Sequence, residues 1–100
     1  MKKRIKLSWT RQAQGDLRAI RSFIARDAPR TASLFVQRLR ASVDRLRTFP
    51  QGWQVVQELG DPEIREILFG NYRIIYRYTT GRIDILTVYH SSRLLDDSQG

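Results

Sequence analysis

The 100-residue sequence has no cysteine, a single histidine and no long apolar run. Without cysteine, neither disulfide bonds nor thiolate metal sites can form, and one histidine would leave a zinc site to carboxylates. No stretch approaches the roughly 20 apolar residues that a membrane-spanning helix needs, and no apolar run follows the basic start of the chain. We therefore expect a cytoplasmic protein with no metal, no other cofactor and no membrane partner.

Acidic residues are scarce relative to basic ones. Ten Asp and Glu stand against eighteen Lys and Arg, which gives a formal net charge of +8, and fifteen of the eighteen are arginines. Arginine contacts phosphate in a bidentate manner and stacks on bases, whereas lysine acts more as a point charge. A positive surface can also simply keep a small protein soluble. We favour an anionic partner, either nucleic acid or an acidic protein.

The N-terminal half reads as one strand followed by two helices. Apolar and polar side chains alternate over roughly residues 4–9, which predicts a half-buried strand. Thr10 can cap a helix that runs to about Arg26. The segment Asp27-Ala28-Pro29 can then begin a second helix, which ends near Thr48. The gap between the helices permits only an antiparallel hairpin.

The C-terminal half has the period of strands. Candidate strands cover residues 55–59, 64–69, 72–79 and 82–90. Gly70-Asn71 and Thr80-Gly81 fit two-residue turns between the last three of them. We therefore predict a single α+β domain over residues 1–100, with elements in the order βααβββ. Its N-terminal strand and antiparallel helix hairpin precede a three- to four-stranded antiparallel meander, and the hairpin packs on one sheet face.

Two-residue turns would set the strand register, so the face of each side chain can be predicted. One face is apolar and aromatic and should meet the helices; it comprises Ile67, Phe69, Tyr72, Ile74, Tyr76, Tyr78, Ile83, Ile85 and Tyr89. We interpret its aromatic row as core rather than as a platform for stacking bases. Arg65 falls on the same face and would need a rim position or an acidic partner.

The opposite face concentrates the charge. Its predicted members are Ile64, Glu66, Leu68, Arg73, Ile75, Arg77, Asp84, Leu86, Val88 and His90. Arg77 lies directly across from Asp84, which predicts a cross-strand ion pair. Arg73 has no counter-ion directly opposite and lies diagonal to Glu66 and His90, so we place an anionic ligand there. The alternatives are that Arg73 and Glu66 form a structural network and that His90 is an ordinary rim histidine.

Over nearly the whole chain, these segments resemble the RelE/ParE toxin superfamily. The matching features are the first strand with Trp9, Asp16-Leu17, residues 20–25, residues 46–50, Glu58, Ile64-Arg65-Glu66, residues 72–77, residues 85–88 and His90-Ser91-Ser92-Arg93. Their order and spacing carry the resemblance, since no single feature is specific. The resemblance implies the toxin component of a bacterial type II toxin–antitoxin system.

The resemblance leaves two activities open, beside a non-toxic member retained only as a binding partner or repressor component. A RelE-like member would cleave messenger RNA on the ribosome without a metal, with Glu66 as base, His90 as acid and Arg73 holding the scissile phosphate. Arg65, Arg73 and Arg93 would then contact the phosphate or the target. A ParE-like member would inhibit DNA gyrase and has no assigned catalytic residues of its own. The paired long helices and the short tail after Arg93 resemble the ParE-like branch more closely, and we favour it.

Both branches imply neutralisation by an antitoxin, either ParD-like or another small acidic protein, whose C-terminal segment wraps the toxin. An acidic, amphipathic segment would complement the net charge of +8. It would also cover apolar side chains that lie off the main helical stripes. We predict that Phe23, Leu34 and Phe35 bind the antitoxin.

Overall fold

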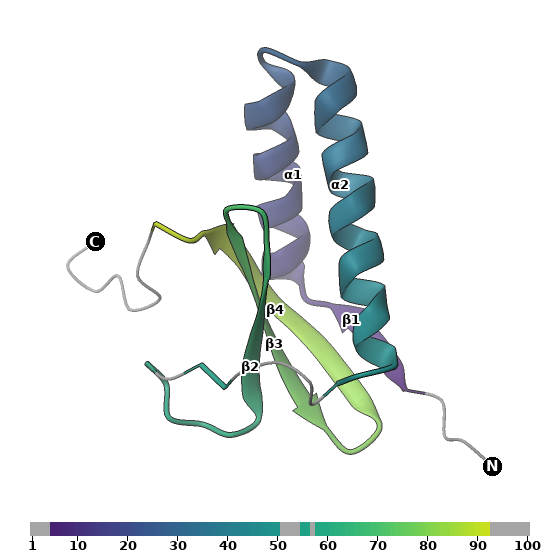
Figure 1. Ribbon diagram of the computed structural model, residues 1–100, viewed down its shortest axis with the longest axis vertical. Helices are drawn as coiled ribbons and strands as arrows, with labels where there is room; N and C mark the ends of the chain where they lie inside the picture. The colour runs from purple at the N-terminus through teal and green to yellow at the C-terminus, as the bar shows by residue number, and fades with distance from the viewer. Residues whose placement is uncertain (1–4, 51–54, 57, 93–100) are drawn as a thin grey trace.

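The computed structural model describes residues 5–50, 55–56 and 58–92 (Figure 1). The elements, in chain order, are β1 (Lys6–Trp9), α1 (Arg11–Ala25), α2 (Pro29–Asp44), the 3-10 turn η1 (Arg45–Arg47), β2 (Ile64–Phe69), β3 (Tyr72–Thr79) and β4 (Arg82–His90). This order confirms the predicted α+β fold. The strand predicted over residues 55–59 is wrong in its described part, where a single bridge joins Val55 to Arg65.

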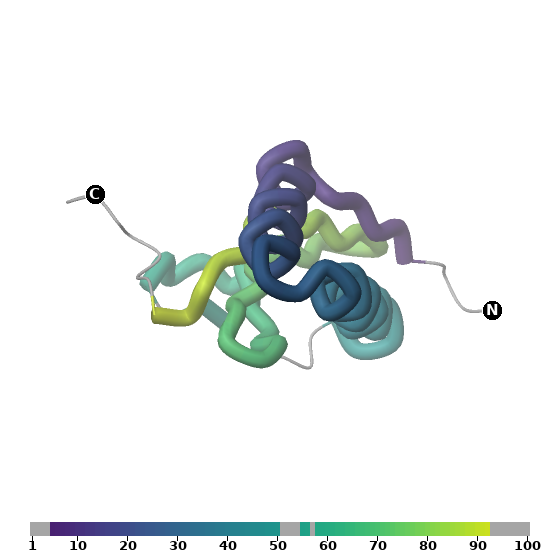
Figure 2. Tube along the Cα trace, turned by 90° about the horizontal axis from the view of Figure 1, so that it is seen from above, coloured from purple at the N-terminus to yellow at the C-terminus, as the bar shows by residue number. Residues whose placement is uncertain are grey.

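The residues at the N-terminus of each helix explain where that helix begins. The hydroxyl of Thr10 accepts the backbone N–H of Ala13 at 3.1 Å and thereby caps α1, as predicted. Pro29 occupies the first turn of α2, where its missing N–H costs nothing, and Ala28 takes the cap position. The two helices run antiparallel and lie side by side when viewed along the hairpin (Figures 1 and 2). The tip of the hairpin extends beyond the sheet (Figure 1).

The four strands form one sheet in the order β1-β4-β3-β2. The antiparallel meander of β2, β3 and β4 is as predicted. Its turns contain Gly70 and Gly81, whose φ angles of 58° and 74° lie in the region that glycine adopts without steric cost. The N-terminal strand β1 pairs parallel with β4 and completes one edge of the sheet. The sequence alone had not placed this strand.

Because of a β-bulge in β4, the observed register differs from the predicted one beyond Ile85. Up to Ile85, which pairs with Tyr76, the strands align as a two-residue turn requires. Thr87 then pairs with Ile75, so Leu86 is the extra residue of the bulge. Because side chains alternate between faces, this one-residue shift moves every later residue of β4 to the other face.

Three predicted placements are therefore wrong. Val88 lies on the helix face as part of the main core, where only 2% of it is exposed. Tyr89 pairs with Arg73 on the opposite face, and His90 pairs with Tyr72 on the helix side. The cause of the shift is the extra residue Leu86. A register predicted from the length of the turn alone does not take such a bulge into account.

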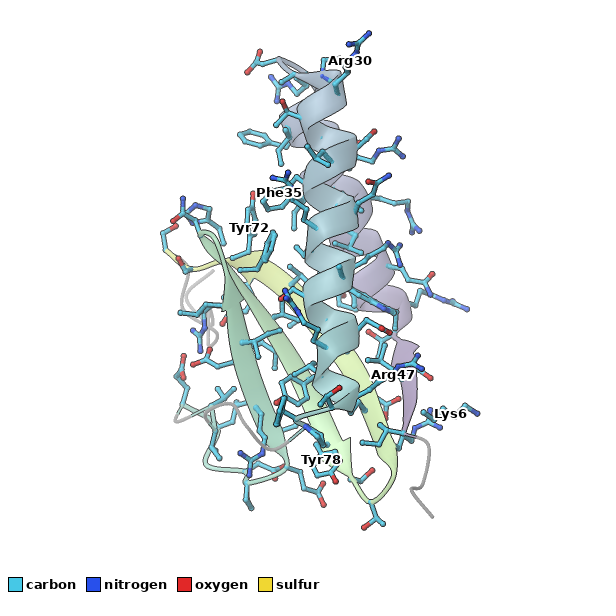
Figure 3. The ribbon with its side chains drawn as sticks, turned by 45° about the vertical axis from the view of Figure 1, so that its right-hand side comes forward. Lys6, Arg30, Phe35, Arg47, Tyr72 and Tyr78 are labelled. Atoms are coloured by element: carbon cyan, nitrogen blue, oxygen red, sulfur yellow. The ribbon has the colours of Figure 1, made fainter. Side chains whose placement is uncertain are left out.

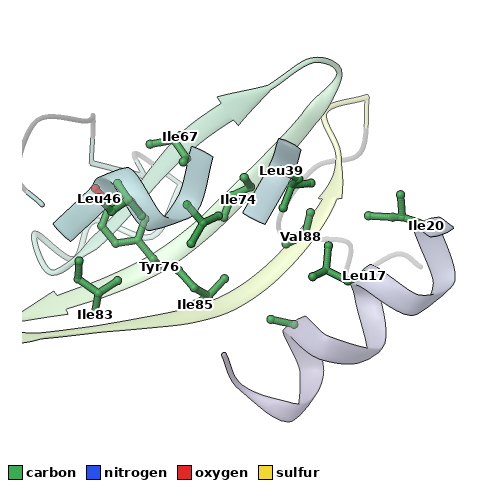
Figure 4. Close-up of a cluster of buried hydrophobic side chains, with 12 residues drawn as sticks. Leu17, Ile20, Leu39, Leu46, Ile67, Ile74, Tyr76, Ile83, Ile85 and Val88 are labelled. Atoms are coloured by element: carbon green, nitrogen blue, oxygen red, sulfur yellow. The ribbon is translucent and has the colours of Figure 1, made fainter. Parts of the chain in front are cut away.

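Helix side chains and one sheet face enclose the main hydrophobic core (Figure 4). Its buried members are Ala13, Leu17, Ile20, Leu39, Val43, Leu46, Ile67, Ile74, Tyr76, Ile83, Ile85 and Val88. The hydroxyl of Tyr76 donates to the carbonyl of Pro50 at 2.9 Å, which satisfies the polar tip of this buried ring. A smaller cluster of Val56, Ile64 and Ile75, with Leu86 and Tyr89 packed against it, covers the opposite face.

Candidate functional site

Arg73 is held between two carboxylates on the sheet face opposite the helices. Its side chain is 12% exposed, and Nε donates to Oε1 of Glu66 at 2.5 Å. Nη1 donates to Oε2 of Glu58 at 2.9 Å, and Nη2 donates to Oε1 of the same carboxylate at 3.4 Å. Arg73 has no carboxylate directly opposite it, as predicted, but the structure shows the alternative to a free anion site, a network with Glu66, and adds Glu58 to it. Glu58 reaches Arg73 because the segment before β2 lies over this face, with Val56 packed on Ile64 and Ile75.

The electrostatics of the Arg73 network favour its charged state. The hydrogen bond from Arg73 lowers the pKa of Glu58, and the bond to Glu58 raises the pKa of Arg73 in return. The Tyr89 ring lies 5.4 Å from the guanidinium carbon, within the range of a cation–π contact. Burial at this position raises the pKa of the Tyr89 hydroxyl. A phosphate entering here would meet two carboxylates around the one guanidinium.

His90 lies on the helix side of the sheet, away from the Arg73 network. Its ring packs edge-on against Tyr72, with centroids 5.4 Å apart. Nδ1 accepts the backbone N–H of Ser92 at 3.1 Å and lies 2.8 Å from the Ser92 hydroxyl oxygen. The structure thus brings Glu66 and Arg73 together but separates His90 from them. The bulge at Leu86 is the reason, because it reverses the faces of the last β4 residues.

The other predicted contact residues are dispersed. Arg65 is half-buried on the β2 strand, across from Tyr76 on the helix side of the sheet. This placement matches the face predicted for it. Arg93 lies outside the described residues, so its predicted role as a target contact stays a prediction.

Arg77 and Asp84 lie opposite each other in the register, as predicted, yet they do not form the predicted ion pair. Arg77 donates to Glu63 at 2.9 Å and lies 3.6 Å from Asp61. Asp84 accepts from Nε of Arg82, two residues before it, at 3.0 Å. Arg77 therefore pairs with acidic residues of the segment before β2, and Asp84 pairs with its neighbour on β4.

An apolar groove of about 480 Å³ lies between α1 and the end of β4. It is lined by Asp16, Ala19, Ile20, Phe23, Tyr72, Val88, Tyr89, His90 and Ser92. Phe23 is 66% exposed at this groove, which makes it a large apolar side chain open to solvent. The sequence reasoning had singled out Phe23 but had placed Val88 and His90 on the other sheet face, and the bulge brings these two residues to the groove.

The other two residues predicted to bind an antitoxin lie elsewhere. Leu34 is exposed and borders a separate hollow with Pro29 at the start of α2. Phe35 packs edge-to-face against Phe69 and Tyr72, with ring centroids 5.3 and 5.5 Å apart (Figure 3). Phe35 is thus a rim residue of the core rather than a freely exposed side chain. The binding role of all three stays a prediction.

The positive charge is unevenly distributed between the two halves of the chain. Residues 11–47, which form the helical hairpin, contain nine arginines and three aspartates. Residues 55–92, which include β2 to β4, contain four arginines and five carboxylates. Among the described residues, no group of three or more acidic or histidine side chains is placed to hold a metal ion. Neither helix described is long and apolar enough to cross a membrane.

A first strand paired parallel with the last, a helical hairpin on one sheet face and a three-stranded antiparallel meander match the fold of the RelE/ParE class of small type II toxins. The model of the family described as "ParE toxin of type II toxin-antitoxin system, parDE" matches residues 7–95, and the chain belongs to this family. A curated relative from Caulobacter vibrioides, named Toxin RelE2, is 31% identical over 87 residues, covering 86% of this chain and 94% of the relative.

Two solved structures are similar to the chain. One is from the chromosomal ParDE toxin–antitoxin system of P. aeruginosa, with a TM-score of 0.73, 26% identity and coverage of 86% of this chain and 95% of the other. The other is from the toxin–antitoxin complex RelBE2 of Mycobacterium tuberculosis, with a TM-score of 0.56 and 20% identity. It covers 87% of this chain and 98% of that one, and this likeness concerns the fold.

Proposed function

We propose that this type II toxin inhibits DNA gyrase by binding and is neutralised by a small acidic antitoxin. The observation that carries the proposal is the arrangement around Arg73. Phosphodiester cleavage without a metal needs an acid, a base and a cation within reach of one phosphate. Arg73 is instead bound by Glu58 and Glu66, and His90 lies across the sheet from them.

The structure of the Arg73 network favours a structural role for this residue. Its guanidinium binds Glu58 through two nitrogens and Glu66 through a third, a geometry that holds the segment before β2 against the sheet. Glu66 is 9% exposed, so its charge depends on this arginine for compensation. Releasing Arg73 to a phosphate would break its bonds to both carboxylates.

The antitoxin belongs to the proposal because of the apolar groove and the charge of the hairpin. A segment with apolar side chains could insert them beside Phe23 and Tyr72, which line the groove. Acidic residues flanking such a segment would face an arginine-rich hairpin. The solved relatives named above come from a ParDE system and a RelBE2 toxin–antitoxin complex, which supports a partner of this kind.

The test is to express the chain under tight control in bacteria and to follow plasmid supercoiling and transcript integrity in the same culture. We expect growth arrest with loss of negative supercoiling and intact transcripts. A purified assay with gyrase, ATP and relaxed plasmid should show the same inhibition. Rapid transcript cleavage with normal supercoiling would instead establish the RelE-like alternative, a ribosome-dependent ribonuclease. Normal growth would contradict both activities.

A further inference from the structure

A second hollow lies on the flank of α1 opposite the apolar groove. It has a volume of about 280 Å³ and is lined by Trp9, Gln14, Leu17, Arg18, Arg21, Val36 and Arg40. We call it the arginine groove. The helical spacing of Gln14, Leu17, Arg18 and Arg21 puts these side chains on one side of α1, whereas Phe23 lies on the other. The two hollows are therefore separate surfaces.

The arginine groove presents three guanidiniums and contains no carboxylate among its lining residues. Arg18, Arg21 and Arg40 are all exposed, and within the described ranges none of them forms an ion pair with an acidic side chain. Arg21 donates to the Ser33 hydroxyl at 3.4 Å, which links the two helices without neutralising the charge.

The sheet arginines differ in this respect. Arg73, Arg77 and Arg82 each bind at least one carboxylate of the same half of the chain. The hairpin arginines of the groove converge from two helices onto one hollow and keep their charge uncompensated. Three uncompensated cations around a concave surface raise the local potential and attract a polyanion.

The basic surface continues beyond the groove along α1. Arg11 precedes Arg18 by seven positions, so it lies two turns away on the same flank of that helix. Arg47 near the base of the hairpin (Figure 3) does not extend this surface, because it lies in η1 and is paired with Asp44 at 3.2 Å. The cations along α1 and in the groove suit a ligand with repeated negative charges.

We propose that the arginine groove binds the phosphate backbone of double-stranded DNA. Arginine forks match phosphate oxygens in bidentate geometry. Arg40 lies over the Trp9 ring, 5.2 Å from its centroid, so this aromatic face is already covered and does not offer a stacking platform for a base. The contact is therefore with the backbone, which makes binding independent of sequence and strongly dependent on salt.

An acidic protein segment fits this groove less well. Leu17 is buried at its base, and the polar side chains of Gln14, Arg18, Arg21 and Arg40 line it beside the half-buried Trp9 and Val36, so its lining is more polar than that of the apolar groove. The apolar groove on the other flank offers that surface. DNA binding goes beyond the proposed gyrase inhibition and is measured without gyrase, so the failure of either idea leaves the other testable.

The experiment measures fluorescence anisotropy of two labelled duplexes of unrelated sequence, titrated with the full chain at several salt concentrations. The variant R18Q/R21Q/R40Q should bind at least about tenfold more weakly and should reduce the slope of log K against log salt by about two to three, close to one per lost phosphate contact. The matched control R45Q/R77Q/R82Q removes the same charge outside the groove. We expect its affinity to change less than about threefold.

A charge-preserving variant, R18K/R21K/R40K, guards against misfolding of the glutamine variant, and thermal unfolding is recorded for all proteins. The lysine variant should keep the salt slope and bind within about tenfold of the wild type. Equal weakening of both glutamine variants would overturn the proposal, because net charge alone would then explain binding. Binding of a labelled poly-glutamate peptide, with no binding of either duplex, would also overturn it and assign the groove to an acidic protein.

Discussion

The carboxylate of Asp16 in α1 accepts the backbone N–H of Val88 in β4 at 2.9 Å. The same oxygen, Oδ2, accepts the hydroxyl of Thr87 at 2.6 Å. Thr10 donates its hydroxyl to the carbonyl of Leu86 at 3.0 Å, so side chains at and near the start of α1 bind three successive residues of β4 at its bulge. These bonds satisfy polar groups where the strand ladder is interrupted. They also hold the register that assigns Tyr89 and His90 to opposite faces.

Replacing Asp16 with alanine should destabilise the protein by about 2 kcal/mol, because a backbone donor and a hydroxyl lose their acceptor. Urea denaturation measures the change in the free energy of unfolding. The matched control is D27A at the exposed tip of the hairpin, where we expect a change within about 0.5 kcal/mol. Equal effects of the two substitutions would show that the Asp16 bonds to β4 contribute nothing to stability.

Replacing Arg73 with lysine should lower stability by about 1 to 2 kcal/mol and leave toxicity intact. Lysine keeps the charge but cannot bind Glu58 and Glu66 through three nitrogens at once. Growth arrest and thermal unfolding are measured side by side, with R77K on the same strand as the control. Loss of toxicity at unchanged stability would point to a catalytic Arg73 and against a structural one.

Stability should decline on acidification through the titration of Glu58. Arg73 lowers the pKa of this carboxyl in the folded protein below the ordinary value of 4.5. The contribution is therefore complete above pH 4.5 and is lost as the pH falls through the lower folded pKa. Urea unfolding from about pH 6 to about pH 3 should show a shallower decline for E58Q than for the wild type. Parallel curves would show that Glu58 is not the titrating group.

Stability should also decline at high pH because of Tyr76. Burial raises the pKa of its hydroxyl from 10.0 to about 12. The folded state therefore retains this proton after the unfolded chain has lost it, and stability falls by about 1.4 kcal/mol per pH unit between the two values. Y76F removes this step and costs about 1 kcal/mol at neutral pH through the lost bond to Pro50. An identical alkaline decline in Y76F would exclude Tyr76 as its source.

Replacing Phe23 with alanine should weaken the complex with the cognate antitoxin about 10- to 100-fold, because an exposed aromatic side chain at an apolar groove is a typical anchor of an interface. The matched control is F49A, since Phe49 is 67% exposed and does not line that groove. We expect F49A to change the affinity less than about threefold, measured by titration calorimetry. Equal effects would place the antitoxin elsewhere.

The parts of the fold that depend on short-range patterns could be predicted. Apolar spacing predicted both helices, and Gly70 and Gly81 predicted the two hairpin turns, because neighbouring residues decide these features. The apolar sheet face was likewise correct from Ile67 to Ile85, where the register follows from turn geometry. The candidate site was predicted less well: Glu66 and Arg73 were correctly placed together, whereas Glu58 was not assigned to them.

The sequence by itself determined the order of the elements, the apolar side of the meander and the excess of arginine, because composition and local periodicity specify these properties. The tertiary structure decided which residues meet at its functional surfaces. Thr10 and Asp16 bind the bulge at Leu86 and the residues after it. Thr10 is 76 residues from Leu86 in the sequence, and Asp16 is 72 residues from Val88. Such contacts exist only after α1 has packed on the sheet, and they place His90 at the apolar groove and Tyr89 beside Arg73.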